Sequence, residues 1–132
     1  MKKALVTGGS GGIGSAICRA LAEDGWTVYV GYASAEETAR ALAAEIGGEA
    51  VRADISFPME VKALFQRVGD VELLVNCAGV AWTGLLQEMS EFDWRHLFGV
   101  NLDGMYRCCR EAIPVMVRRH DLKMILHLYV LS

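Results

Sequence analysis

The sequence predicts a doubly wound α/β domain, in which a parallel sheet carries helices on both faces. Three observations lead to this prediction. Short apolar runs rich in β-branched residues alternate, along the 132 residues, with runs whose apolar positions recur at helical spacing. The connections are short, and glycines stand where the early helices would have to stop. Strands and helices that alternate in this way form parallel pairs with right-handed crossovers, which favours the strand order 3-2-1-4-5.

Each element follows from its own residues. The first helix has Ile13, Ile17 and Leu21 along one face and should end at Gly25. The last helix begins at Ser90 with the capping pattern S-E-F-D, ahead of an apolar run. The expected strands are Lys3–Thr7, Thr27–Gly31, Ala50–Arg52, Val71–Asn76 and Lys123–Leu131. The expected helices are Gly12–Asp24, Ala35–Ile46, one that Ser56 caps with Pro58 in its first turn, and Ser90–Val117.

Composition and charge exclude several classes of function. The formal net charge is −3 and there is no basic block, so we expect neither nucleic acid nor a membrane surface as a partner. No apolar run reaches the roughly 18 residues that a membrane span needs. The cysteines and histidines lack metal-ligand spacing, so we expect no metal site and reduced thiols in a cytoplasmic protein. These residues are Cys18, Cys77, Cys108, Cys109, His96, His120 and His127.

The first loop, V-T-G-G-S-G-G-I-G at residues 6–14, places five glycines directly after the first strand. In a parallel sheet this loop lies at the carboxyl ends of the strands, where ligands bind. Glycines let the backbone approach a pyrophosphate, and the helix that follows offers free N–H groups and the positive end of its dipole. The loop therefore predicts nucleotide binding. A turn that only packs the helix on the strand is the alternative.

The spacing T-G-x-x-x-G-x-G resembles that of the classical short-chain dehydrogenase/reductase family, with Thr7, Gly8, Gly12 and Gly14 at the motif positions. Three further stretches resemble the family in the same order: A-D-I at 53–55, N-C-A-G at 76–79 and V-N-L-D-G-M-Y at 100–106. The resemblance runs from residue 1 to about 127. It is strongest to the 3-oxoacyl-(acyl carrier protein) reductases and the similar elongation factor P 5-aminopentanone reductases, and it implies a Rossmann-like fold.

The resemblance also implies a cofactor site and one catalytic residue, Asn101, in the N-x-x-G segment. The implied cofactor-binding residues are Gly8, Ser10, Gly11, Gly12, Ile13 and Gly14 at the phosphates, Asp54 and Ile55 beside the adenine, and Asn76, Ala78 and Gly79 along the ribose and nicotinamide. Three of these positions have a structural alternative: Asp54 could cap the turn before Ser56, Asn76 could tie strand ends together, and Asn101 could be a solvated helix residue. Cys77 departs from the family's N-N-A-G, and a thiol cannot reproduce the hydrogen bonds of an amide.

The choice of dinucleotide depends on the end of the second strand. A site for NAD needs an acidic residue about 20 positions after the glycines, to bind the ribose 2′-hydroxyl. The stretch G-Y-A-S at 31–34 has none, and Ser34 could hydrogen-bond a 2′-phosphate. Against this, Gly11 stands where many NADP-using relatives carry a basic residue. The sequence favours NADP, with NAD as the alternative.

The family completes its active site with a serine on the fifth strand and a Tyr-x-x-x-Lys pair on the next helix, whose tyrosine protonates the developing alkoxide. By alignment Val130 stands at the serine position, Ser132 lies two residues late, and Tyr129 has no lysine four residues on. We therefore expect a chain truncated after the fifth strand, naturally, by engineering or by a frameshift, and inactive by itself.

Residues 1–132 are thus expected to form one dinucleotide-binding domain, incomplete at its C-terminus. The parent would be an NADP-dependent oxidoreductase, similar to those of fatty acid biosynthesis. It would reduce a small-molecule or acyl-carrier-bound ketone, in the cytoplasm and as a homo-oligomer. The alternatives are a non-catalytic dinucleotide-binding module and a fragment without a function of its own.

Overall fold

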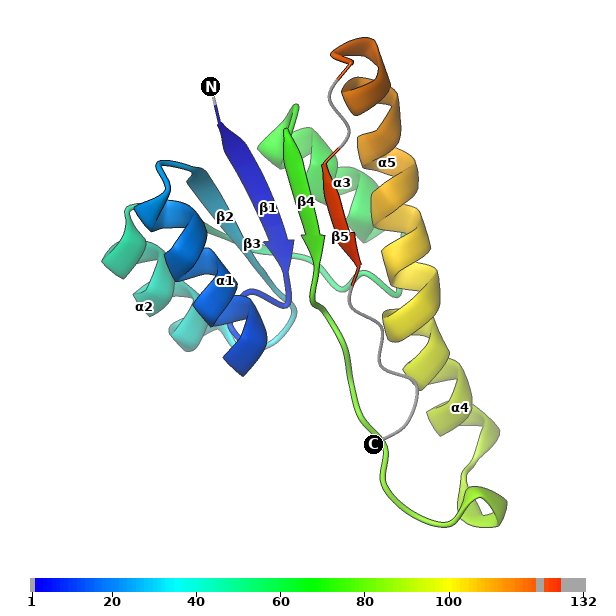
Figure 1. The fold of residues 1–132 in the computed structure, drawn as a ribbon. Coiled ribbons are helices and arrows are strands. Elements are labelled where there is room, and N and C mark those ends of the chain that lie inside the picture. The colour runs from blue at the N-terminus through cyan, green and yellow to red at the C-terminus, as the bar shows by residue number, and fades with distance from the viewer. Residues whose placement is uncertain (1, 121–122, 127–132) are drawn as a thin grey trace.

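The computed structural model describes residues 2–120 and 123–126. Its five strands form one parallel sheet in the order β3-β2-β1-β4-β5, which confirms the predicted order. The central strand β1 pairs with β2 on one side and with β4 on the other (Figure 1). The strands are β1 (Lys3–Thr7), β2 (Thr27–Tyr32), β3 (Glu49–Arg52), β4 (Leu73–Asn76) and β5 (Met124–Leu126). Residues 127–131 of the predicted fifth strand lie outside the described residues.

Helices cover both faces of this sheet (Figure 1). The helices α1 (Gly12–Glu23) and α2 (Glu36–Ile46) pack on one face, and α3 (Pro58–Val68) and α5 (Met105–Arg118) pack on the other. Leu5 and Leu74 belong to the core beneath α3 and α5, whereas their neighbours Val6 and Val75 belong to the core beneath α1 and α2. All four side chains are fully buried. The apolar strands are therefore explained by burial on two faces.

The start of α3 differs from the prediction. Phe57 is its N-cap and Pro58 stands in its first turn. Because proline has no backbone N–H, the helix start has one donor fewer for a cap to satisfy. Ser56 instead points back along the chain, where its N–H and its hydroxyl donate to Oδ1 of Asp54 at 3.0 and 2.6 Å. The prediction that Ser56 caps the helix is wrong, because the Asp54 carboxylate competes for the serine in a local turn. Asp54 does cap this turn, as the structural alternative for that residue proposed.

The predicted long helix is present, but it is not uniform. Ser90 caps α4 (Glu91–Phe98) as predicted, because its hydroxyl accepts a hydrogen bond from the N–H of Asp93 at 3.0 Å. Between α4 and α5 the segment Gly99–Gly104 forms a π-helical turn, which the sequence analysis missed. Asn101 lies in this turn and is 3% exposed, so its alternative as a solvated helix residue is wrong. The connection from β4 to α4 contains a short 3₁₀ turn at Leu86–Glu88.

Candidate functional site

A cavity of about 480 Å³ opens at the carboxyl ends of the first four strands. The loops that follow these strands line it, so residues far apart in the sequence meet there. The predicted site residues in its wall are Gly8, Ser10, Gly11, Ser34, Asp54, Ile55, Ala78 and Gly79. The structure thus brings eight predicted positions around one cavity of a size that suits a small-molecule ligand. Their binding roles stay predictions.

The other predicted site residues do not line this cavity. They are Gly12, Ile13, Gly14, Asn76 and Asn101. Gly12 and Ile13 are exposed in the first turn of α1, where Ile13 is 48% exposed. Gly14, Asn76 and Asn101 are buried behind the lining loops. Because of this burial, we expect the latter three to act by shaping those loops.

The glycines of the first loop serve two different purposes. Gly8 has a φ of +62°, and a Cβ added there would lie 2.6 Å from Cα of Ala78. A Cβ at Gly14 would lie 2.1 Å from the carbonyl oxygen of Gly8, so these two glycines allow close approach of backbone to backbone. Apart from its chain neighbours and the backbone of its own helix, no heavy atom lies within 4 Å of a Cβ placed at Gly12, so packing does not require a glycine there.

The open space at Gly12 lies at the N-terminus of α1. The first N–H groups of a helix have no partner within the helix, and the helix dipole makes this end positive. Packing does not require a glycine at this position, but the absence of a side chain leaves the N–H groups beside it accessible. The space therefore fits a phosphate group, and a Cβ would begin to fill it.

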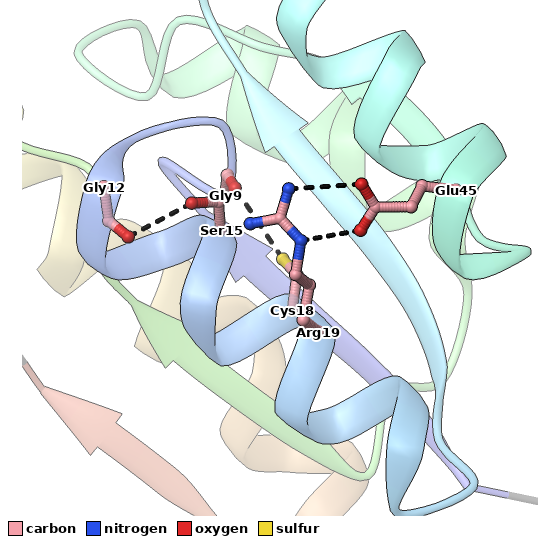
Figure 2. A network of polar contacts seen from close by, with 6 residues as sticks. All are labelled: Gly9, Gly12, Ser15, Cys18, Arg19 and Glu45. Atoms are coloured by element: carbon pink, nitrogen blue, oxygen red, sulfur yellow. Dashed lines mark hydrogen bonds and ion pairs between the residues drawn. The ribbon is translucent and has the colours of Figure 1, made fainter.

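Polar contacts lie within the first turn of α1 and between α1 and α2 (Figure 2). The Ser15 hydroxyl donates to the carbonyl of Gly12 at 3.1 Å. Arg19 forms two hydrogen bonds with the Glu45 carboxylate of α2, at 2.6 and 3.3 Å. These bonds raise the pKa of Arg19 and lower that of Glu45. This bidentate pair links α1 to α2 and helps to fix the direction in which the α1 terminus points.

Cys18 lies beneath the glycine loop, and its thiol donates to the carbonyl of Gly9 at 3.8 Å (Figure 2). Burial is the main reason that its pKa rises to about 12, and the nearby Cys77 raises it further. Because the folded protein favours the protonated thiol, the resulting stabilisation is complete below pH 9.0 and is lost as the pH rises towards about 12.

This pH dependence can be measured by urea unfolding at about pH 8 and about pH 10.5. We expect the free energy of unfolding to fall more for the wild-type chain than for Cys18→Ala, which has no thiol to ionise. An equal fall in both proteins would contradict the assignment.

The loop after β4 is fastened at two points, and the strand end before it at a third. The N–H of Ala78 donates to the Thr7 hydroxyl at 3.2 Å. The Asn101 side chain holds Val80 from both sides: its Oδ1 accepts from the N–H of Val80 and its Nδ2 donates to the carbonyl, both at 2.8 Å. The Asn76 amide donates to Sγ of Cys109 in α5 at 3.7 Å. Asn76 therefore joins the end of β4 to α5, which is a structural contact but not the tie between strand ends that its alternative proposed. Asn101 shapes the loop that carries Ala78 and Gly79.

Tyr32, Arg52 and His96 also line the cavity wall. The sequence suggested no site role for Tyr32 or Arg52, and His96 was expected to have no functional role. Tyr32 and Arg52 are partners in the β2–β3 register, at the carboxyl ends of both strands. The sequence did contain a signal for Arg52, because it is a charged residue at the end of the predicted third strand, where ligands bind. His96 comes from α4, and local spacing does not reveal that this helix reaches the cavity.

The described residues contain no group of three or more His, Cys, Asp and Glu side chains placed to hold a metal ion. The same part of the chain includes no helix that is long and apolar enough to span a bilayer. All four cysteines are free thiols.

Comparison with known proteins agrees with this geometry. A family model described as short chain dehydrogenase matches residues 2–125. A 3-oxoacyl-[acyl-carrier-protein] reductase FabG from Staphylococcus aureus is 39% identical over 129 residues, which cover 91% of this chain and 52% of that protein.

Solved structures share the fold. One described as a short chain dehydrogenase/reductase family protein has a TM-score of 0.88 at 31% identity, covering 93% of this chain and 53% of that one. The structure of BdcA in complex with NADPH has a TM-score of 0.81 at 32% identity, covering 93% and 47%. The chain therefore spans about half the length of these relatives. Since the family model matches nearly all of its residues, this chain belongs to the short-chain dehydrogenase family.

Proposed function

We propose that this chain binds NADP(H) and is the dinucleotide-binding part of an oxidoreductase that reduces a 3-oxoacyl or similar ketone. The observation that carries the proposal is the cavity at the strand ends, which the glycine loop borders, together with the open space at Gly12 at the start of α1. Two relatives support it: one is described as a complex with NADPH and another as a 3-oxoacyl-[acyl-carrier-protein] reductase. NADPH, when bound, would supply the hydride.

The chain's own residues would bind and orient this cofactor. Gly8, Ser10 and Gly11 would border the phosphates, and the first turn of α1, with Gly12 and Ile13, would bind them through its free N–H groups. Gly14, which is buried behind the loop, would let the loop and α1 approach closely. Ser34 would lie at the ribose 2′ position, and Asp54 and Ile55 beside the adenine. Ala78 and Gly79 would border the ribose and nicotinamide, with Asn76 behind them. Asn101 would keep that loop in position and contribute to the catalytic site of the whole enzyme.

Reduction of the ketone belongs to the whole enzyme in this proposal. No tyrosine in the sequence is followed by a lysine four residues later. Without that acid, general acid catalysis worth about 10²–10⁴-fold would be missing, so we propose that this chain alone has negligible reductase activity. The whole enzyme would act in the cytoplasm on a small or acyl-carrier-bound ketone.

Assembly into a homo-oligomer is also proposed for the whole enzyme. Large apolar side chains on α4 and α5 support it: Phe92, Trp94, Tyr106 and Val117 are 77%, 47%, 57% and 58% exposed. A surface of this kind is typical of a protein interface.

Titration of the purified chain with NADPH and NADH, followed by cofactor fluorescence, tests the proposed binding. Saturable NADPH binding without ketone reduction is the expected result. A non-catalytic dinucleotide-binding module would give the same result. A protein extended to the length of the relatives must therefore reduce a ketone if the proposed function is correct. Failure of the purified chain to bind either cofactor would overturn the proposal.

Gly12→Ala sharpens this test. Outside its own helix backbone, the added methyl group meets no atom within 4 Å, so we expect no loss of melting temperature. It would nevertheless occupy the space in front of the α1 terminus, and we expect NADPH affinity to fall about tenfold or more. Gly99→Ala is the matched control, because its Cβ would meet only Ser56 Cβ at 3.7 Å and the residue lies in the π-helical turn rather than at the α1 terminus. Undiminished binding by Gly12→Ala would contradict the phosphate assignment.

A further inference from the structure

We propose that Arg52 is the residue that selects a 2′-phosphate on the bound dinucleotide and so determines specificity for NADP over NAD. This inference rests on the proposed function and assigns a role within the same site. It begins from an unmet need: a 2′-phosphate carries negative charge, and an arginine near the ribose usually compensates it. Neither Gly11 nor Ser34, the positions considered from the sequence, carries a charge.

The sheet places Arg52 at the required position. Arg52 is the last residue of β3, and its register partner Tyr32 is the last residue of β2. The two strand ends stay together beyond the ladder, because the N–H of Ala53 donates to the carbonyl of Tyr32 at 2.9 Å. Arg52, Tyr32 and Ser34 all line the cavity. The adenosine ribose binds at the end of the second strand in folds of this kind, so Arg52 borders the 2′ position.

The other charged side chains near this point are engaged elsewhere. Asp54 also lines the cavity, but its Oδ1 already accepts two hydrogen bonds from Ser56. Glu36, at the start of α2, forms an ion pair with Arg40 at 2.9 Å. Among the described residues that line the cavity, Arg52 is therefore the one whose side chain carries a permanent positive charge.

The present partner of Arg52 can be exchanged. The guanidinium Nη1 lies 3.1 Å from Oε1 of Glu60 in α3, in a pair whose side chains are 59% and 36% exposed. Ion pairs with this exposure contribute little to stability. The same Oε1 also accepts from the N–H of Asp54 at 2.9 Å, so Glu60 keeps a backbone partner when Arg52 turns away. A phosphate offers the arginine stronger bidentate hydrogen bonds in return.

Arg52→Gln tests this role directly through binding. We expect its NADPH affinity to fall about tenfold, as loss of a hydrogen bond between charged groups predicts, while its NADH affinity stays unchanged. Arg67→Gln is the matched control: Arg67 forms an ion pair with Glu49 at the other end of β3 and does not line the cavity. This control should leave both affinities unchanged.

Salt and a second variant give independent readouts. The wild-type affinity for NADPH should fall more steeply with ionic strength than that for NADH, and Arg52→Gln should abolish this difference. Glu60→Gln should raise NADPH affinity, because it releases Arg52 from its ion pair. If Arg52→Gln lowers the affinities for NADPH and NADH equally, or lowers neither, this inference is overturned and the proposed function stands. Binding of neither cofactor by the wild-type chain would overturn both.

Discussion

Replacement of Gly14 by alanine should destabilise the folded chain by about 3 kcal/mol. The new methyl carbon would lie 2.1 Å from the carbonyl oxygen of Gly8 and 2.9 Å from Cα of Gly9. Both are backbone atoms, so no flexible side chain can move aside, and the loop and helix must separate. The better helix propensity of alanine offsets at most about 1 kcal/mol of this loss. Urea unfolding followed by far-ultraviolet circular dichroism measures the change.

Gly12→Ala provides the control for this experiment. It makes the same chemical change in the same helix turn, at a position where a Cβ has no neighbour within 4 Å. We therefore expect opposite behaviour from the two variants: Gly14→Ala loses stability, and Gly12→Ala loses binding alone. A Gly14→Ala protein with the wild-type urea midpoint would refute the close packing of α1 against the loop.

Replacement of Asn101 by alanine should cost about 2 kcal/mol and loosen the connection after β4. The change removes both hydrogen bonds to Val80 and leaves its N–H and carbonyl without these partners. Because Val80 adjoins the cavity residues Ala78 and Gly79, we also expect weaker NADPH binding. Thermal unfolding gives the loss of stability, and limited proteolysis reports cleavage within residues 80–90.

Two further variants at this turn separate the hydrogen bonds from the π-helical geometry. Asp103→Ala changes an exposed residue of the same turn and should leave stability and proteolysis unchanged. Asn101→Asp can still accept from the N–H of Val80, but an ionised carboxylate cannot donate to the carbonyl. Its stability should fall at neutral pH, because a buried carboxylate is also costly. If Asn101→Ala is cleaved within residues 80–90 no faster than the wild-type chain, the role of Asn101 in holding the loop is refuted.

Much of the fold could be predicted because its signals are local. Apolar periodicity located the strands and helices, and the cap at Ser90 is set by the residues beside it. The strand order followed from the alternation of strands and helices with right-handed crossovers. The glycine spacing likewise placed the candidate site at the end of β1, and the cavity lies there.

The errors arose where a distant or competing partner decides the local structure. Ser56 has the composition of a helix cap, but the Asp54 carboxylate takes both of its donors. The π-helical turn at Gly99–Gly104 places Asn101 against Val80, 21 positions away, and no periodicity within the helix reports that contact.

The sequence by itself therefore determined the fold class, the strand order and the place of the glycine loop, because these depend on near neighbours and on chain connectivity. Only the tertiary structure decided which glycine is required by packing and which one keeps space open. It also brought Arg52 beside Tyr32 at the cavity and Asn101 to Val80. These outcomes depend on close approach between segments that are remote in the chain, and such distances follow from how the layers pack.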